Sequence, residues 1–256
     1  MKRFNSYLLG VLMIFLIMGG CATNQVNDIG IDREPDKVAR LNLELGMAYM
    51  EKNDNARALK KLRKAIQIDP QYADAHNAIA ILYSRLGEDQ KAGTHFEKAT
   101  QIAPNDPSAL NNYGQYLCKQ GQRKKADTMF ERALANPLYD TPQFAHLNAG
   151  ICAKQDKDLE QAEIHFRSAL KKDPYMSPAL YQMADLSHSL KRNLPARAYL
   201  ERFTQAARHN AKSLWLAVKV EKALGDVDAE ASYALRLKNN FPDSQETRLL
   251  LESEGK

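Results

Sequence analysis

Three cysteines, Cys21, Cys118 and Cys152, carry the thiols that could form covalent bonds in this 256-residue chain. Cys21 stands near the N-terminus, directly behind an apolar stretch and two glycines. Cys118 and Cys152 lie 34 residues apart in the body of the chain. A thiolate can be acylated, oxidised to a disulfide or used as a nucleophile. The chemistry open to each cysteine therefore depends on the segment that positions it.

The segment before Cys21 predicts export. It begins with Lys2 and Arg3 and continues as an apolar run from Tyr7 to Met18. A charged start, a short apolar run and small residues before a cleavage point are typical of a secretory signal peptide. A run of about 12 residues is too short to cross a hydrocarbon core of ~30 Å.

A cysteine directly after such a segment resembles the lipobox of bacterial lipoproteins. In that family the thiol is acylated with fatty acids such as palmitate, and the preceding residues are removed. The resemblance implies a signal peptide over residues 1–20 and lipidation of Cys21. Met18 departs from the usual Leu of the box, and Ala22 is similar to the residue found in lipoproteins sorted to the outer membrane. Ordinary secretion, with a cut near Ala22 and Thr23, is the alternative.

Small residues and prolines recur every 34 residues through the rest of the chain. The recurring sets are Ala58, Ala92 and Ala126; Ala65, Ala99 and Ala133; and Pro70 and Pro104. After a two-residue insertion near 140–142, the frame resumes with Ala162, Ala169, Pro174 and Ala196. A fixed period of this length indicates a repeat architecture in which each repeat is one helix hairpin.

The repeats resemble tetratricopeptide repeats. The units carry Leu45-Gly46-x-x-Tyr49, Ile79-Ala80-x-x-Tyr83, Tyr113-Gly114-x-x-Leu117 and Ala149-Gly150-x-x-Ala153, each followed by Ala, then Phe or Leu, then Ala. This resemblance implies an all-α, right-handed superhelical solenoid of about six helix-turn-helix repeats over 37–242. Their approximate bounds are 39–72, 73–106, 107–140, 143–176, 177–210 and 211–244. We expect residues 21–36 to form a lipidated tether and residues 243–256 a C-terminal cap or tail.

The repeat frame also predicts the individual helices. We expect Gly or Ala at the eighth position and Ala at the twentieth to allow close approach, and Phe or Leu at the twenty-fourth to fill the space between neighbouring pairs. Asp106, Thr141 and Ser177, each followed by Pro, are expected N-caps. The expected helices span 37–52, 56–69, 73–86, 90–103, 107–120, 124–136, 142–155, 159–172, 177–191, 195–208, 211–224, 227–240 and 244–252.

Cys118 and Cys152 are expected to form a structural disulfide. Once Cys21 is lipidated, they remain as an even pair in an oxidising compartment, where a bridge can persist. They fall at the twelfth and tenth positions of the first helices of repeats three and four, so they need a small axial shift to meet. Two free, partly buried thiols are the alternative.

Nothing in the sequence indicates catalysis. There is no Gly-rich phosphate loop, no His-Glu-x-x-His and no nucleophile elbow. His76 and His146 occupy a usually apolar position, so we expect packing histidines, with no metal site, no cofactor and no small-molecule substrate. A formal net charge of +5, which falls to +3 without Lys2 and Arg3, does not call for nucleic acid. The basic clusters at 60–64 and 123–125 are expected to be solvated helix faces.

The concave face of the solenoid is the expected partner-binding groove. In tetratricopeptide repeats it is lined by positions two, five, nine and twelve of each first helix. Leu43 and Met47 stand where the carboxylate clamp of chaperone-binding relatives would begin, so such a clamp is not expected. An apolar, Met-bearing groove suits an amphipathic helix or an extended peptide. The candidate groove residues are Leu43, Met47, Met50, Asn77, Ile81, Asn111, Gln115, Leu147 and Ile151. Packing against the tether or a neighbouring helix is the alternative role of these side chains.

Two local stretches and the lipobox at Cys21 resemble the tetratricopeptide-repeat lipoproteins of type IV pilus biogenesis and stability, a pilotin family. The stretches are Asn111-Asn112-Tyr113-Gly114-x-Tyr116-Leu117-Cys118 and 146–152. The resemblance implies a non-enzymatic adaptor on the periplasmic face of the outer membrane. Such an adaptor would bind secretin subunits and promote their localisation and multimerisation. A lipoprotein scaffold for outer-membrane barrel assembly or for cell-wall enzymes is the alternative.

Overall fold

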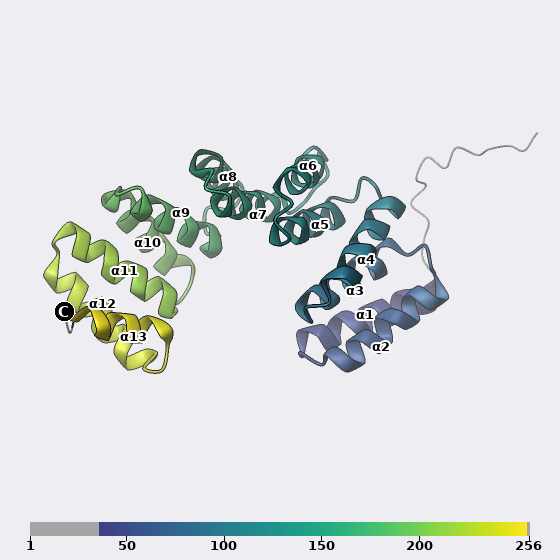
Figure 1. The fold of residues 1–256 in the computed structure, drawn as a ribbon, viewed down its shortest axis with the longest axis horizontal. Coiled ribbons are helices and arrows are strands. Elements are labelled where there is room, and N and C mark those ends of the chain that lie inside the picture. The colour runs from purple at the N-terminus through teal and green to yellow at the C-terminus, as the bar shows by residue number, and fades with distance from the viewer. Residues whose placement is uncertain (1–35, 255–256) are drawn as a thin grey trace, which may run out of the picture. The chain divides into compact units, whose positions relative to one another are not determined.

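The computed structural model describes residues 36–254, which form thirteen α-helices and no strand. The expected signal peptide, Cys21 and nearly all of the expected tether lie outside the described residues. Figure 1 shows helix hairpins that follow one another along this part of the chain. The all-α architecture expected from the 34-residue period is therefore present.

Twelve of the helices form six hairpins in chain order, and α13 follows the last one. Their bounds are α1 Lys37–Glu51, α2 Asn55–Ile68, α3 Ala73–Arg85, α4 Asp89–Ile102, α5 Pro107–Lys119, α6 Arg123–Leu134, α7 Pro142–Gln155, α8 Leu159–Lys172, α9 Ser177–Ser189, α10 Asn193–Ala206, α11 Ala211–Leu224, α12 Val227–Asn240 and α13 Gln245–Glu254. Every bound lies within two residues of the one expected from the repeat frame.

The odd-numbered helices form an inner layer. Each of them contacts the next odd-numbered helix, from α1 and α3 through to α11 and α13. No two even-numbered helices of the described residues contact each other; α2, α4, α6, α8, α10 and α12 pack only on their neighbours in the chain. The face lined by the first helix of each hairpin is therefore the inner one, as the groove prediction requires.

Glycine at the eighth repeat position lets the two helices of a hairpin approach closely. A Cβ atom built on Gly150 would lie 2.6 Å from two ring atoms of Phe166, and one built on Gly114 would lie 2.7 Å from Cε1 of Phe130. Both phenylalanine rings are buried. The aromatic side chain at position twenty-four thus fills the space above the glycine of its own hairpin, and not only the space between hairpins as expected.

The same aromatic position also joins successive hairpins. The Phe96 ring of α4 stacks on Tyr113 of α5 at a centroid distance of 6.0 Å and packs on Tyr116 at 5.3 Å. The Tyr116 hydroxyl donates to the backbone carbonyl of Asp89 at 2.7 Å. Phe96 and the two tyrosines therefore link the core of the first two hairpins to that of the third.

The expected helix caps are only partly right. The Asp106 carboxylate accepts hydrogen bonds from the backbone of α5, whereas Thr141 makes no side-chain cap bond to α7. At α9 the expectation was wrong, because Met176 is the N-cap and Ser177 is already helical. The Met176 carbonyl accepts the first backbone bond of that helix, from Leu180 at 3.0 Å, so the helix begins one residue earlier.

Candidate functional site

The inner face begins with a small apolar area on the first two hairpins. Met47 of α1 is 49% exposed, and Ile81 of α3 is half-buried. Leu43 and Met50 are each only 6% exposed and belong to the hydrophobic core of the first hairpins. Of the apolar residues expected here, Met47 therefore offers most of the accessible side-chain surface.

Amide side chains continue this face across α3, α5 and α7. Asn112 donates to Asn77 Oδ1 at 3.3 Å, and Asn148 donates to Asn111 Oδ1 at 3.0 Å. Gln115, which is exposed, donates to Asn148 Oδ1 at 3.3 Å. We call these five residues the amide ladder. Asn111 is buried, and Asn148 makes two of these bonds. An amide has two N–H donors and an acceptor oxygen, so the accessible members, Gln115 above all, keep capacity for a partner's backbone.

Beyond the amide ladder the two apolar candidates of α7 are less accessible than Met47, although Phe144 of the same helix is 49% exposed. Leu147 of α7 is 7% exposed and lies in a core cluster, and Ile151 is half-buried. Lys154 donates to Gln182 Oε1 at 3.0 Å and forms an ion pair with Asp185. The charge of Lys154 is therefore balanced within the protein.

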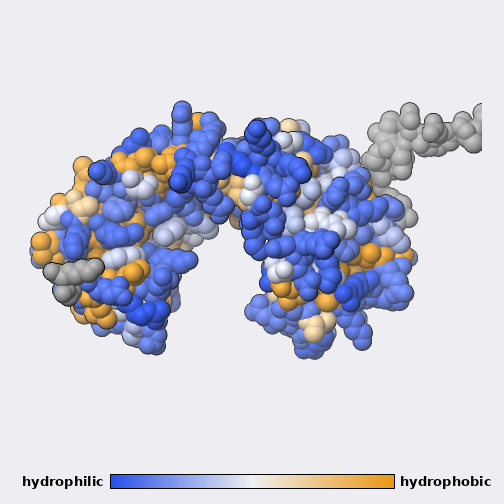
Figure 2. Space-filling view, in the orientation of Figure 1, coloured by the Kyte–Doolittle hydropathy of each residue, from blue (hydrophilic) through white to orange (hydrophobic). Residues whose placement is uncertain are grey.

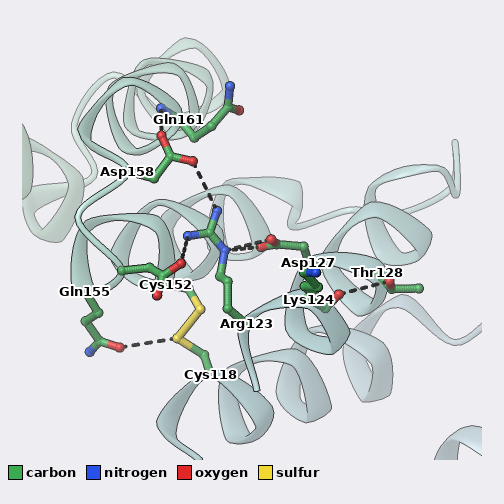
Figure 3. A network of polar contacts seen from close by, with 10 residues as sticks. Cys118, Arg123, Lys124, Asp127, Thr128, Cys152, Gln155, Asp158 and Gln161 are labelled. Atoms are coloured by element: carbon green, nitrogen blue, oxygen red, sulfur yellow. Dashed lines mark hydrogen bonds and ion pairs between the residues drawn. A yellow bond between two sulfur atoms is a disulfide. The ribbon is translucent and has the colours of Figure 1, made fainter. Parts of the chain in front are cut away.

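Cys118 and Cys152 lie side by side on α5 and α7, where the structure joins them as a disulfide (Figure 3). Their Cα atoms are 5.7 Å apart, which is the usual spacing of a bridge. The Gln155 Oε1 atom lies 3.3 Å from the Cys118 sulfur. The axial shift needed to bring positions twelve and ten together is thus present, and oxidation of the pair in the protein stays a prediction.

An arginine network lies next to this cysteine pair. Arg123 of α6 donates through Nε to both carboxylate oxygens of Asp127 at 2.7 Å. Its other nitrogens lie 3.7 Å from Asp156 and Asp158, in the turn between α7 and α8. Figure 3 shows the guanidinium between Asp127 and Asp158. Part of the basic cluster at 123–125 therefore holds repeats three and four together instead of being freely solvated.

In two hairpins, a histidine of the first helix faces a histidine of the second, a feature that the sequence analysis missed. His76 Nδ1 lies 2.9 Å from His95 Nδ1, and His146 Nδ1 lies 3.3 Å from His165 Nδ1. Burial lowers the pKa of all four imidazoles, and it lowers the pKa of His95 and His146 to about 4. The signal was the shared separation of 19 residues in repeats two and four.

The described residues hold no candidate metal cluster and no candidate membrane span. No group of three or more His, Cys, Asp or Glu side chains between residues 36 and 254 could hold a metal ion. In the same range no helix combines the length and apolarity needed to span a bilayer. A shallow surface depression does open on the first hairpin, lined by Asn42 of α1 and by residues of α2.

Comparisons with known proteins identify the repeats and the relatives. Family models described as TPR repeat or tetratricopeptide repeat match residues 46–87, 71–137 and 114–177. The type IV pilus assembly protein PilF of Pseudomonas aeruginosa is 32% identical over 238 residues, covering 91% of this chain and 94% of that protein. The expected tetratricopeptide-repeat superhelix is therefore confirmed.

Two solved structures agree over most of the chain. The crystal structure of PilW, described as a widely conserved type IV pilus biogenesis factor, has a TM-score of 0.79 and is 30% identical, covering 84% of this chain and 99% of that one. The structure of PilF from Pseudomonas aeruginosa has a TM-score of 0.76 and is 31% identical, covering 85% of this chain and 98% of that one.

Proposed function

Because the chain belongs to the family of tetratricopeptide-repeat type IV pilus assembly proteins that includes PilF, we propose that it is a pilotin of type IV pilus biogenesis. In this role it binds secretin subunits in the periplasm and promotes their localisation and multimerisation in the outer membrane. The observation that carries the proposal is the 32% identity with PilF over 94% of that protein's length.

Lipidation of Cys21 supplies the membrane attachment in this proposal. A single acyl chain gives only marginal binding, whereas several chains on one cysteine hold a protein firmly at a bilayer. The helical repeats are then confined to the membrane surface, where their effective concentration toward a membrane-bound partner is high. The signal-like segment before Cys21 and the residue Ala22 support a site on the periplasmic face of the outer membrane.

The protein acts by binding and not by catalysis in this proposal. Met47 provides an accessible, adaptable apolar contact, and the amide ladder provides hydrogen bonds for the backbone of a bound segment. The bridge between Cys118 and Cys152 and the Arg123 network brace repeats three and four, on which most of the amide ladder lies. A segment of the secretin occupies this inner face.

A single substitution tests the proposed site. Replacing Met47→Glu places a charge on the apolar area, and we expect recovery of the secretin with the tagged full-length protein to fall about tenfold or more. The matched control is Leu194→Glu, because Leu194 is 67% exposed on α10 of the outer layer. Both variants should keep the helical circular dichroism of the parent. Unchanged secretin recovery with Met47→Glu, or equal loss with Leu194→Glu, contradicts the proposed site.

A further inference from the structure

Helix α2 in the first hairpin is strongly basic. Its fourteen residues include Arg57, Lys60, Lys61, Arg63 and Lys64 and no acidic residue. Four of these five residues are exposed, and Lys61 is half-buried. We call these five residues the basic face. Figure 2 shows that hydrophilic side chains cover most of the visible surface and that hydrophobic ones gather in separate patches. The basic face differs from the other hydrophilic surface because all of its charges are positive.

The charge of the basic face is largely unbalanced. Arg57 pairs with Asp54, the N-cap of the helix. Arg63 donates to the Tyr83 hydroxyl at 3.0 Å, and Lys64 donates to Gln67. Within residues 36–254, Lys60, Lys61, Arg63 and Lys64 form no ion pair. The other basic cluster differs, because Arg123 there is held by three carboxylates.

The place of α2 in the chain limits how far the basic face can lie from the lipidation site. Residues 22–36 separate Cys21 from the first residue of α1, so at full extension they span about 50 Å. The first hairpin has no described hairpin before it to cover its outer end. The surface depression at this end is lined by Asn42 and by α2 residues that include Lys60, Arg63 and Lys64.

We propose that the basic face of α2 docks on the anionic phospholipid headgroups of the leaflet that holds the Cys21 lipid. The inference rests on the proposed lipid anchor, which keeps α2 near the bilayer. Each basic side chain close to an anionic leaflet raises partitioning about fivefold, so several together fix an orientation. A second copy of this chain is a poor occupant, because two basic faces repel each other. Since α2 lies in the outer layer, docking leaves Met47 and the amide ladder open to the secretin.

A tryptophan reporter measures this docking. The chain has one tryptophan, Trp215 in α11. In a Trp215→Phe background, Gln67→Trp places the reporter on α2, in the lining of the depression. The full-length lipidated protein is inserted into phosphatidylcholine vesicles, with or without one third phosphatidylglycerol, that carry a headgroup-linked nitroxide quencher. We expect strong quenching at position 67 only with phosphatidylglycerol, and its loss at about 1 M salt, where screening acts over ~3 Å.

Charge reversal supplies the matched comparison. Lys60→Glu, Lys61→Glu and Lys64→Glu together should abolish quenching at position 67. The control is the equal charge change Lys124→Glu, Lys125→Glu and Lys171→Glu on α6 and α8, which should leave quenching unchanged. The native Trp215 of the parent should not respond to phosphatidylglycerol. Circular dichroism verifies that all variants are folded.

Three results would overturn the docking. They are equal quenching in neutral and anionic vesicles, no quenching in either, and equal loss in the control variant. If α2 instead holds an acidic protein segment, vesicles give no quenching while the triple reversal lowers secretin recovery, and the membrane inference fails. Protein that floats with anionic but not with neutral vesicles contradicts the lipid anchor, yet quenching at position 67 in that case still supports docking.

Discussion

A hydrogen bond joins the Nδ1 atoms of His76 and His95, and the Pro70 carbonyl determines which of the two donates. The Nε2 atom of His76 lies 3.2 Å from the Pro70 carbonyl, which can only accept, so this nitrogen carries a proton. In neutral His76 the Nδ1 atom is then the acceptor, and His95 Nδ1 is the donor across 2.9 Å. These hydrogen bonds need no charge, because both rings are neutral. An added proton would place a positive charge in a site that is largely shielded from water.

This arrangement predicts a loss of stability in mild acid. Burial lowers the pKa of His95 to about 4, against an ordinary value of 6.5. Between these values the unfolded chain binds more protons than the folded one, so the free energy of unfolding falls as pH drops from about 6.5 to about 4. His146 and His209 add to the effect, because burial also lowers their pKa to about 4.

Denaturant unfolding at several pH values measures this slope. The histidines should leave the unfolding free energy unchanged between about pH 7 and pH 9, and it should decline steadily below pH 6.5. The double variant His95→Gln and His165→Gln should show a smaller decline, with His209 supplying part of what is left. A pH dependence identical in the parent and the double variant would contradict the role of the histidine pairs.

The contact between Gly150 and Phe166 predicts a sharp response to one added methyl group. A Cβ at position 150 would lie 2.6 Å from the Phe166 ring, which is fully buried and cannot move freely. We expect Gly150→Ala to lower the free energy of unfolding by about 1–3 kcal/mol.

Gly93→Ala is the matched control for this prediction. There the nearest atom to an added Cβ is the Tyr116 hydroxyl at 2.7 Å, so the methyl group displaces one hydrogen bond, to the Asp89 carbonyl, and not a fully buried ring. Both glycines lie inside helices, so the gain of about 1 kcal/mol in helix propensity on going to alanine is common to both variants. Gly93→Ala should therefore cost less than Gly150→Ala in the same denaturant titration. The reverse order would show that close helix approach at the eighth position does not limit this fold.

The cysteine pair on α5 and α7 predicts redox-dependent stability. A bridge that closes a loop of 34 residues stabilises the folded state by about 3–4 kcal/mol in the chain-entropy model. Cys118→Ser and Cys152→Ser, singly or together, should therefore lower the unfolding free energy by a similar amount. Reduction of the parent should have the same effect, and reduction of the double variant should have none.

Alkylation without reductant tests the bridge itself. Intact mass after treatment of the denatured, unreduced protein should show no label on Cys118 or Cys152. Two added labels at these positions would exclude a bridge and support the alternative of free thiols.

Much of the fold could be predicted because one period of small residues and prolines sets every hairpin. The helix bounds and the close approach at Gly114 and Gly150 follow from that period. The N-cap of α9 could not be predicted from residue type, because the Met176 backbone opens that helix without a side-chain cap bond, whereas Ser177 was expected to cap it.

The candidate site was less predictable than the fold. Leu43, Met50, Asn111 and Leu147 occupy repeat positions assigned to the groove, yet their side chains are buried against neighbouring helices. Whether a side chain at one of these positions is buried or exposed depends on the packing of adjacent hairpins. The repeat frame does not specify that packing. The histidine pairs needed the geometry of both helices of a hairpin, although their equal spacing was visible.

The amount of secretin multimer in the outer membrane tests the central claim most directly. Strains with the gene deleted, restored, or restored as Met47→Glu are fractionated, and heat-resistant secretin multimers are quantified in each membrane fraction. The proposed function predicts few outer-membrane multimers in the deletion and in Met47→Glu, and normal amounts after restoration of the parent or of Leu194→Glu. Normal multimers in the outer membrane of the deletion strain would contradict it.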